Sequence, residues 1–102
     1  MAILRLSIFT PQPGNEKRVA NLLEALDTAF AQQSGYVLGL RFTGTGGDGE
    51  LGRIFVWESD QAGQRAEESP EASSLVRRLQ QLSQPDPMER SFHLQGYALR
   101  PS

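Results

Sequence analysis

The sequence predicts an α+β domain in which four antiparallel strands carry helices on one face. Four segments alternate apolar and polar residues with a period of two, which is typical of strands. Two longer segments place apolar residues at helical spacing. The chain has 102 residues, which is enough for one core but not for two. We therefore expect a single domain over residues 1–102.

The first half of the chain predicts a strand followed by a helix. Alternation from Ile3 to Phe9 puts Leu4, Leu6 and Ile8 on one face and Arg5, Ser7 and Phe9 on the other. An apolar stripe then follows at helical spacing: Val19, Leu22, Leu23, Leu26 and Phe30. Asn15 is suited to cap this helix, and Gly35 is suited to stop it.

The middle of the chain predicts a β-hairpin. Residues 36–42 and 51–57 both alternate, and the glycine-rich segment GTGGDGELG, residues 44–52, predicts the loop that joins them. Strand parity predicts one face that is rich in aromatic residues: Tyr36, Leu38, Leu40, Phe42, Arg53, Phe55 and Trp57.

The last third predicts two helices and a strand. Residues 59–68 are polar and favour a short helix, and Ser69-Pro70 then reads as an N-cap with proline at the first helical position. The second apolar stripe consists of Ala72, Leu75, Val76, Leu79 and Leu82. The last strand is expected over residues 91–99. The resulting order β-α-β-β-α-β is the ferredoxin-like plan with a four-stranded antiparallel sheet.

Both faces of the expected sheet carry apolar side chains, although helices can cover only one of them. An exposed apolar sheet face of roughly several hundred square ångströms normally marks an interface. We therefore expect a homodimer in which two sheets pack face to face. The alternative is that some of these side chains lie singly on a tolerated surface.

Composition narrows the classes of function. The absence of cysteine excludes disulfides, thiolate metal sites and a cysteine nucleophile, and it favours a cytoplasmic location. The formal net charge of −2 provides no basic field for nucleic acid. No apolar segment has the length of a signal peptide or a membrane span, so we expect no membrane association.

Several short motifs resemble the antibiotic biosynthesis monooxygenase family of dimeric α+β barrels. They are the Gly35-Tyr36 pair that opens the second strand, VWES at residues 56–59, and SPEA at residues 69–72. The resemblance covers residues 3 to 99. It implies the fold, a dimer, and one of several activities: cofactor-independent oxygenation of aromatic polyketides, quinol oxygenation or haem degradation. The family also includes members with no known activity.

The haem-degrading branch of that family implies an asparagine, a tryptophan and an iron-ligating histidine. The corresponding positions here are Ser7, Trp57 and Val76. Only the tryptophan matches, and valine cannot ligate iron. We therefore expect no metal and no cofactor.

Candidate site residues come mainly from the aromatic-rich face. His93 is the first candidate for a general base, with Tyr97 two positions further on, but the parity does not decide which sheet face they occupy. Ser7 offers a hydroxyl, and Arg53 could hold an anionic oxygen. The candidate catalytic residues are thus His93, Tyr97 and Ser7, and the candidate substrate-binding residues are Trp57, Arg53, Phe55, Tyr36 and Phe9. Each also has a structural interpretation, as a core aromatic, a hydrogen-bonded side chain or a surface residue.

The predicted function is cofactor-independent oxygenation of a small aromatic or quinol-type compound. The alternative is a non-catalytic dimeric domain that binds a small ligand or has a stress-related role. A void between helices and sheet that touches Trp57 and one of Ser7, Arg53, His93 or Tyr97 would favour the enzyme. A filled core there would exclude the enzyme.

Overall fold

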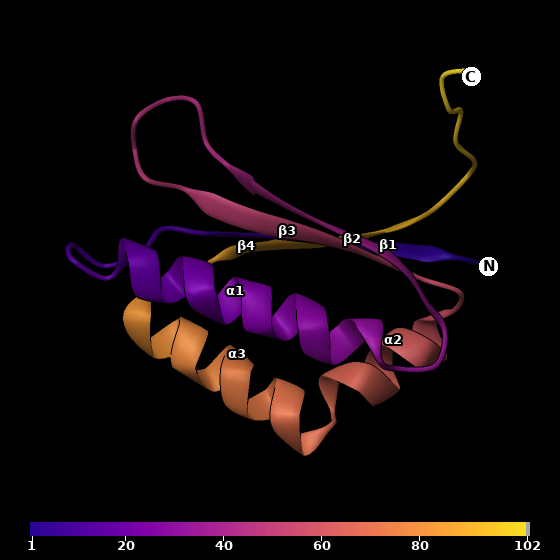
Figure 1. The fold of residues 1–102 in the computed structure, drawn as a ribbon, viewed down its shortest axis with the longest axis horizontal. Helices are drawn as coiled ribbons and strands as arrows, with labels where there is room; N and C mark the ends of the chain where they lie inside the picture. The colour runs from indigo at the N-terminus through magenta and orange to yellow at the C-terminus, as the bar shows by residue number, and fades with distance from the viewer. Residues whose placement is uncertain (102) are drawn as a thin grey trace.

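The computed structural model describes residues 1–101 and has the order β-α-β-β-α-α-β (Figure 1). The strands are β1 (Ile3–Phe9), β2 (Tyr36–Thr43), β3 (Leu51–Trp57) and β4 (Met88–His93). The helices are α1 (Glu16–Ala31), α2 (Asp60–Glu67) and α3 (Pro70–Leu82). The predicted ferredoxin-like α+β class is confirmed, because the strands form one sheet of order β2-β3-β1-β4 with antiparallel neighbours throughout.

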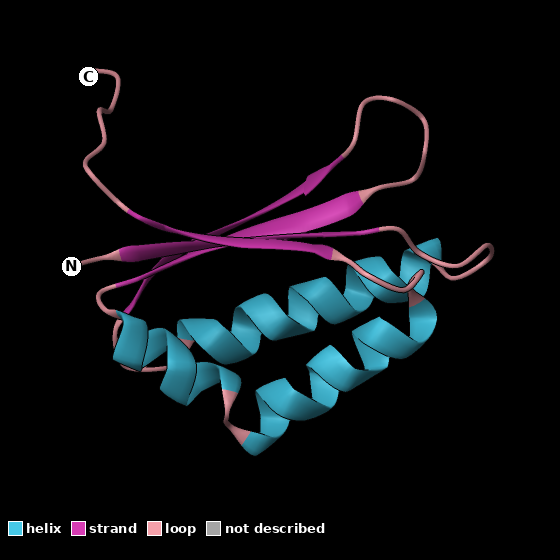
Figure 2. Cartoon of the chain, turned by 180° about the vertical axis from the view of Figure 1, so that it is seen from behind, coloured by secondary structure: helices cyan, strands magenta, loops and turns pink. Residues whose placement is uncertain are grey.

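All three helices lie on the same side of the sheet, as both ribbon views show (Figures 1 and 2). The helix α1 packs on β2 and β3, and α3 packs mainly against α1. The other side of the sheet, which we call the outer face, has no helix over it (Figure 2). No helix within residues 1–101 has the length and apolar character needed to cross a membrane.

Serine caps fix where the two later helices begin. The Ser59 hydroxyl accepts a hydrogen bond from the Ala62 backbone N–H at 3.1 Å, and the Ser69 hydroxyl accepts one from Ala72 at 3.3 Å. Pro70 follows at the start of α3, where its missing N–H costs nothing. Asn15 occupies the N-cap position of α1 but makes no side-chain capping bond.

Gly35 does not stop α1 as the sequence suggests, because that helix already ends at Ala31. The glycine instead turns the chain into β2 with a φ of +88°, a conformation that side chains disfavour. A Cβ atom there would also lie 2.5 Å from the Ala62 Cβ. Gly35 is therefore needed for the turn and for the close approach of α2.

The core lies between α1 and the helix-facing side of the sheet. Its largest buried side chains are Trp57, Phe9, Phe30, Phe55, Leu26, Leu79 and Val19. Phe30 from α1 meets Phe55 and Trp57 edge to face, with ring centres 4.6 and 5.2 Å away. These packed rings attach α1 to β3.

The predicted face of β2 is wrong beyond Tyr36, because the register shifts between Tyr36 and Leu38. Tyr36 pairs with Trp57 and stays on the helix side. Leu38 pairs with Val56, and Leu40 with Ile54, so these leucines lie on the outer face. Phe42, opposite Gly52, lies there too. The extra residue at the bulge reverses the parity of the rest of the strand.

The last strand begins and ends earlier than predicted. It spans Met88–His93 rather than 91–99, and the pairing puts Glu89 opposite Ser7 and His93 opposite Ile3. Because β1 begins at Ile3, little chain remains to pair with residues beyond His93; the backbone N–H of Leu94 still donates to Ala2. Residues 95–101 rise from the outer side of the sheet (Figure 1).

Candidate functional site

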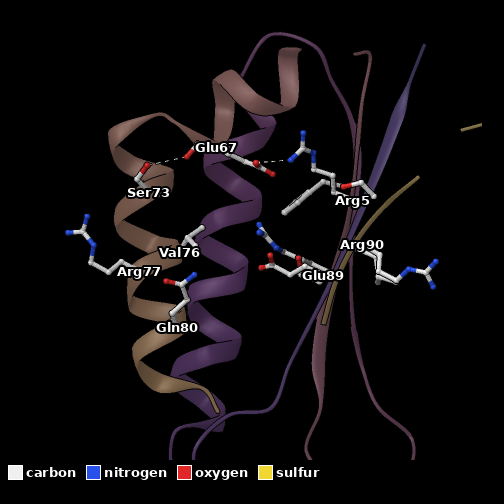
Figure 3. A pocket seen from close by; sticks show the side chains of 13 residues that line it. Arg5, Glu67, Ser73, Val76, Arg77, Gln80, Glu89 and Arg90 are labelled. Atoms are coloured by element: carbon white, nitrogen blue, oxygen red, sulfur yellow. Dashed lines mark hydrogen bonds and ion pairs between the residues drawn. The ribbon is translucent and has the colours of Figure 1, made fainter. Parts of the chain in front are cut away.

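A cleft of about 580 Å³ lies between the sheet and α3 (Figure 3). The strands β1, β3 and β4 supply its floor, and the end of α2 and one side of α3 supply the opposite wall. Its lining includes Arg5, Ser7, Arg53, Phe55, Glu67, Ser73, Val76, Arg77, Gln80, Glu89 and Ser91. Most of these side chains are polar, whereas most of the substrate-binding residues expected from the sequence are aromatic.

Arg53 is the most unusual residue of the cleft, because its charged side chain is buried. The residue is only 6% exposed, and neither Nε nor Nη1 has a hydrogen-bond partner. The guanidinium lies over the Phe55 ring at 4.7 Å and near the Phe30 ring at 5.5 Å. Burial lowers the pKa of Arg53 to about 10, while Glu67 and Glu89 act to raise it. Leaving such buried N–H donors unpaired is costly in a protein interior. Both nitrogens are shielded from solvent, so it is the positive charge of Arg53 that the cleft offers to an anionic ligand.

Three polar side chains form a row across the floor of the cleft. Ser7 of β1 pairs with Arg53 of β3 on one side and with Glu89 of β4 on the other. Side chains of directly paired residues lie on the same face of a sheet, and all three of these line the cleft. The row therefore presents a buried guanidinium, then a hydroxyl, then an exposed carboxylate.

One end of the cleft is closed by an ion pair. The Arg5 Nη1 donates to the Glu67 Oε2 at 2.8 Å, which joins β1 to the end of α2 (Figure 3). The Ser73 hydroxyl donates to the Glu67 backbone carbonyl at 3.1 Å. Arg77 and Arg90 point away from the space between α3 and the sheet (Figure 3).

The sheet brings three predicted site residues, Ser7, Arg53 and Phe55, into this cleft. The other predicted aromatics lie elsewhere. Trp57 is fully buried and Phe9 is 1% exposed in the core. Tyr36 packs partly buried against that core, with its ring centre 5.5 Å from that of Trp57. These three residues are therefore placed as packing residues.

His93 and Tyr97 do not share a strand face, because Tyr97 lies beyond β4 and is 83% exposed. His93 is on the helix-facing side, but at the end of the sheet, with its Nε2 3.8 Å from Asp60 of α2. Neither residue lines the cleft. The sequence analysis expects a void that touches Trp57. The cleft is lined by Ser7 and Arg53 but not by Trp57.

Sequence reasoning missed Glu67 and Glu89 as cleft residues. Glu89 was missed because the last strand was predicted to begin at Ser91. Residues 89–91 are all polar, so no apolar alternation extends the strand pattern back to that point. Glu67 could not be found in this way, because its place depends on how α2 packs.

A second polar cluster lies at the edge of the core, between α1 and β2. Asp27 pairs with Arg41, and its Oδ1 is buried without a partner. Burial raises the pKa of Asp27, with Arg41 and Arg53 acting in the opposite direction. Burial, followed by the charge of Asp27, raises the pKa of Tyr36. This cluster joins α1 to the sheet.

The residues present do not fit a haem iron. Val76 lines the cleft from α3, at the position where the family resemblance implies an iron ligand, and its side chain is aliphatic. Within residues 1–101, no group of three or more histidine, aspartate or glutamate side chains is placed to hold a metal ion.

Comparison with known proteins finds solved structures with the same fold. No family model and no curated protein matches the sequence. SnoaB, a cofactor-independent oxygenase from Streptomyces nogalater, has a similar structure, with a TM-score of 0.82 and 21% identity over 94% of this chain and 95% of that one. Rv0793 from Mycobacterium tuberculosis is similar with a TM-score of 0.87 and 17% identity, over 97% of this chain and 100% of that one. A protein described as an antibiotic biosynthesis monooxygenase has a TM-score of 0.81 and 14% identity, over 90% of this chain and 97% of that one. The chain thus has the fold of antibiotic biosynthesis monooxygenase-type proteins.

Proposed function

We propose that this protein is a cofactor-independent monooxygenase acting on a small aromatic or quinol-type compound in the cleft beside α3. The observation that carries the proposal is Arg53, whose buried, positively charged side chain belongs to the lining of that cleft. The likeness of the fold to a cofactor-independent oxygenase supports it.

The reaction would need a substrate that can form a stable anion. In the simplest case an activated methylene and O2 give a carbonyl and water, so that R2CH2 + O2 becomes R2CO + H2O. Without a cofactor, the protein contributes by stabilising the negative charge that develops on the substrate oxygen. Arg53 lines the cleft and supplies a positive charge for that purpose, in a site where burial strengthens the interaction.

The test is oxygen consumption with anthrones and hydroquinones as a panel of substrates. We would compare wild type with Arg53→Met. The control is Arg65→Met, at an exposed position outside the cleft lining. Loss of one preorganised donor group commonly costs about 100-fold in kcat. We expect a drop of at least that size in Arg53→Met and no change in the control. Equal rates in wild type and Arg53→Met would remove Arg53 from the mechanism, and no oxygen consumption by wild type would reject the oxygenase.

A second candidate is a non-catalytic dimeric domain that binds a small ligand. The observation in its favour is that the predicted proton acceptor His93 and its neighbour Tyr97 both lie away from the cleft. Calorimetric titration with the same compounds under nitrogen separates the two functions. Binding that depends on Arg53, without oxygen consumption in air, would support this candidate.

The proposal includes a homodimer formed through the outer face of the sheet. Exposed or half-buried apolar side chains gather on that face: Leu4, Leu6, Ile8, Leu38, Leu40, Phe42, Ile54, Met88 and Phe92. A second copy would remove them from water. A cytoplasmic location belongs to the same proposal, and the absence of cysteine supports it.

A further inference from the structure

We propose that Glu89 is the catalytic base of this cleft and takes the proton that the substrate must lose. The inference rests on the proposed oxygenase function, because a proton acceptor is needed only if the substrate reacts as an anion. It replaces His93, which the sequence favours for that role but which lies beside Asp60 at the end of the sheet.

The position of Glu89 follows from strand pairing. It is directly opposite Ser7, whereas its neighbours Met88 and Arg90 pair with Ile8 and Leu6 and lie on the outer face. The Glu89 side chain extends from β4 toward α3, and Arg90 extends the other way (Figure 3). The carboxylate therefore faces the substrate space while its backbone is fixed in the sheet ladder.

The row from Arg53 through Ser7 to Glu89 has a positive charge at one end and a carboxylate at the other. Directly paired residues of adjacent strands have Cβ atoms about 4.5–5.5 Å apart. A substrate lying over Ser7 would thus have a guanidinium on one side and a carboxylate on the other. Its negative charge would be stabilised at Arg53, and its proton could be accepted at Glu89.

The proton-transfer step balances without a cofactor. The C–H bond of a methylene conjugated to a carbonyl breaks, and the proton passes to a carboxylate oxygen of Glu89. The electron pair stays on the substrate as an enolate whose oxygen faces Arg53. O2 then adds to the deprotonated carbon and forms a C–O bond, and the resulting peroxide takes back the proton held by Glu89. Loss of the second C–H proton and cleavage of the O–O bond release water and leave the carbonyl.

The other candidate bases of the cleft are less suited to this role. Glu67 already accepts the hydrogen bond of Arg5 at 2.8 Å. Ser7 lies in the right place, but an unassisted hydroxyl is a poor base. Among residues 1–101, no ion pair within 4 Å involves Glu89 or Arg53. The Glu89 carboxylate is therefore free to accept a proton.

Hydrogen–deuterium exchange of anthrone under nitrogen tests the step without any oxygen chemistry. The methylene proton signal is followed by NMR in D2O with wild type, Glu89→Gln, Glu89→Asp and the control Glu71→Gln. Glu71 is an exposed residue in the first turn of α3, outside the cleft lining. General bases commonly contribute about 100-fold or more, so we expect Glu89→Gln to lose at least that factor. Glu89→Asp should be intermediate, and Glu71→Gln should equal wild type.

The outcomes separate this inference from the proposed function. Exchange that is equal in wild type and Glu89→Gln, or that is no faster than in buffer alone, overturns the role of Glu89 whatever the oxygen electrode records. Exchange that depends on Glu89, in a protein that consumes no oxygen, supports the role of Glu89 and rejects the oxygenase. Circular dichroism of each variant establishes that the comparison is made between folded proteins.

Discussion

The guanidinium carbon of Arg53 lies 4.7 Å from the centre of the Phe55 ring, two residues further along β3. Side chains two positions apart on a strand lie on the same face, so the cation covers the ring at the cleft floor. Both residues line the cleft, so the guanidinium and the aromatic ring lie side by side in its wall. This stacking also holds Arg53 in place without using its hydrogen-bond donors.

Arg53 should be important for activity but not for stability. Burial lowers the pKa of Arg53 to about 10, so the folded protein holds this proton more weakly than the unfolded chain does. The buried charge thus costs stability below pH 10, and the cost is relieved as the pH rises further. Replacing a buried charge by an apolar residue of similar volume is often neutral or stabilising by about 1–4 kcal/mol.

We therefore expect Arg53→Met to have a free energy of unfolding at pH 7 equal to or above that of wild type. Urea unfolding measures it, with Arg65→Met as the exposed control. The difference in the free energy of unfolding between Arg53→Met and wild type should shrink as the pH rises above 10, because wild-type Arg53 then loses its charge. Clear destabilisation of Arg53→Met at pH 7 would contradict this balance of desolvation against stacking.

Asp27 should make wild type relatively more stable as the solution is acidified. Burial, the largest influence, raises the pKa of Asp27, so the folded protein takes up this proton at a higher pH than the unfolded chain. The resulting stability is present at low pH and is lost as the pH rises through the raised pKa. Urea unfolding gives the free energy of unfolding of wild type and of Asp27→Asn. As the pH is lowered from 7, the value for wild type should rise relative to the value for Asp27→Asn. A shift in favour of Asp27→Asn would mean that the Arg41 charge outweighs burial.

Gly63 should be needed for the packing of α2 on Trp57. A Cβ atom at Gly63 would lie 3.0 and 3.2 Å from two atoms of the Trp57 ring, which is fully buried and cannot move aside easily. Overpacking of this kind costs about 1–3 kcal/mol, which exceeds the helix-propensity gain of about 1 kcal/mol for Gly→Ala. We expect Gly63→Ala to lower the urea midpoint.

The matched control for that change is Gly46→Ala in the hairpin loop, where an added Cβ atom would have no neighbour within 4 Å. It should unfold at nearly the same urea concentration as wild type. A Gly63→Ala protein at least as stable as wild type would show that Trp57 can shift, and that the packing at this end is loose.

The outer face should determine the oligomeric state. Leu40 is 56% exposed and lies on that face, on the edge strand β2 opposite Ile54 of β3. Analytical ultracentrifugation should give about twice 11.3 kDa for wild type. Leu40→Glu should give the monomer mass, because a dimer would bury an unpaired charge. Ala25→Glu, at an exposed position of α1, should leave the dimer intact. A wild type that remains monomeric at micromolar concentration would contradict the interface.

Local patterns are sufficient to predict the elements and the fold class. The apolar stripe from Val19 to Phe30 requires a helix, and the serine before Pro70 marks where another begins. Alternation over residues 3–9 and 51–57 gives β1 and β3 their correct bounds and correct faces. This holds because side-chain periodicity and capping depend on neighbours along the chain.

The sequence by itself determined the ferredoxin-like plan and the shared face of Arg5, Ser7 and Phe9. The bulge after Tyr36 moved Leu38, Leu40 and Phe42 to the outer face, because one extra residue in a ladder reverses every later side chain. The early start of β4 set Glu89 beside Ser7. Only the tertiary structure decided these placements, because register depends on pairing between strands distant in the chain, and the cleft depends on how α3 packs.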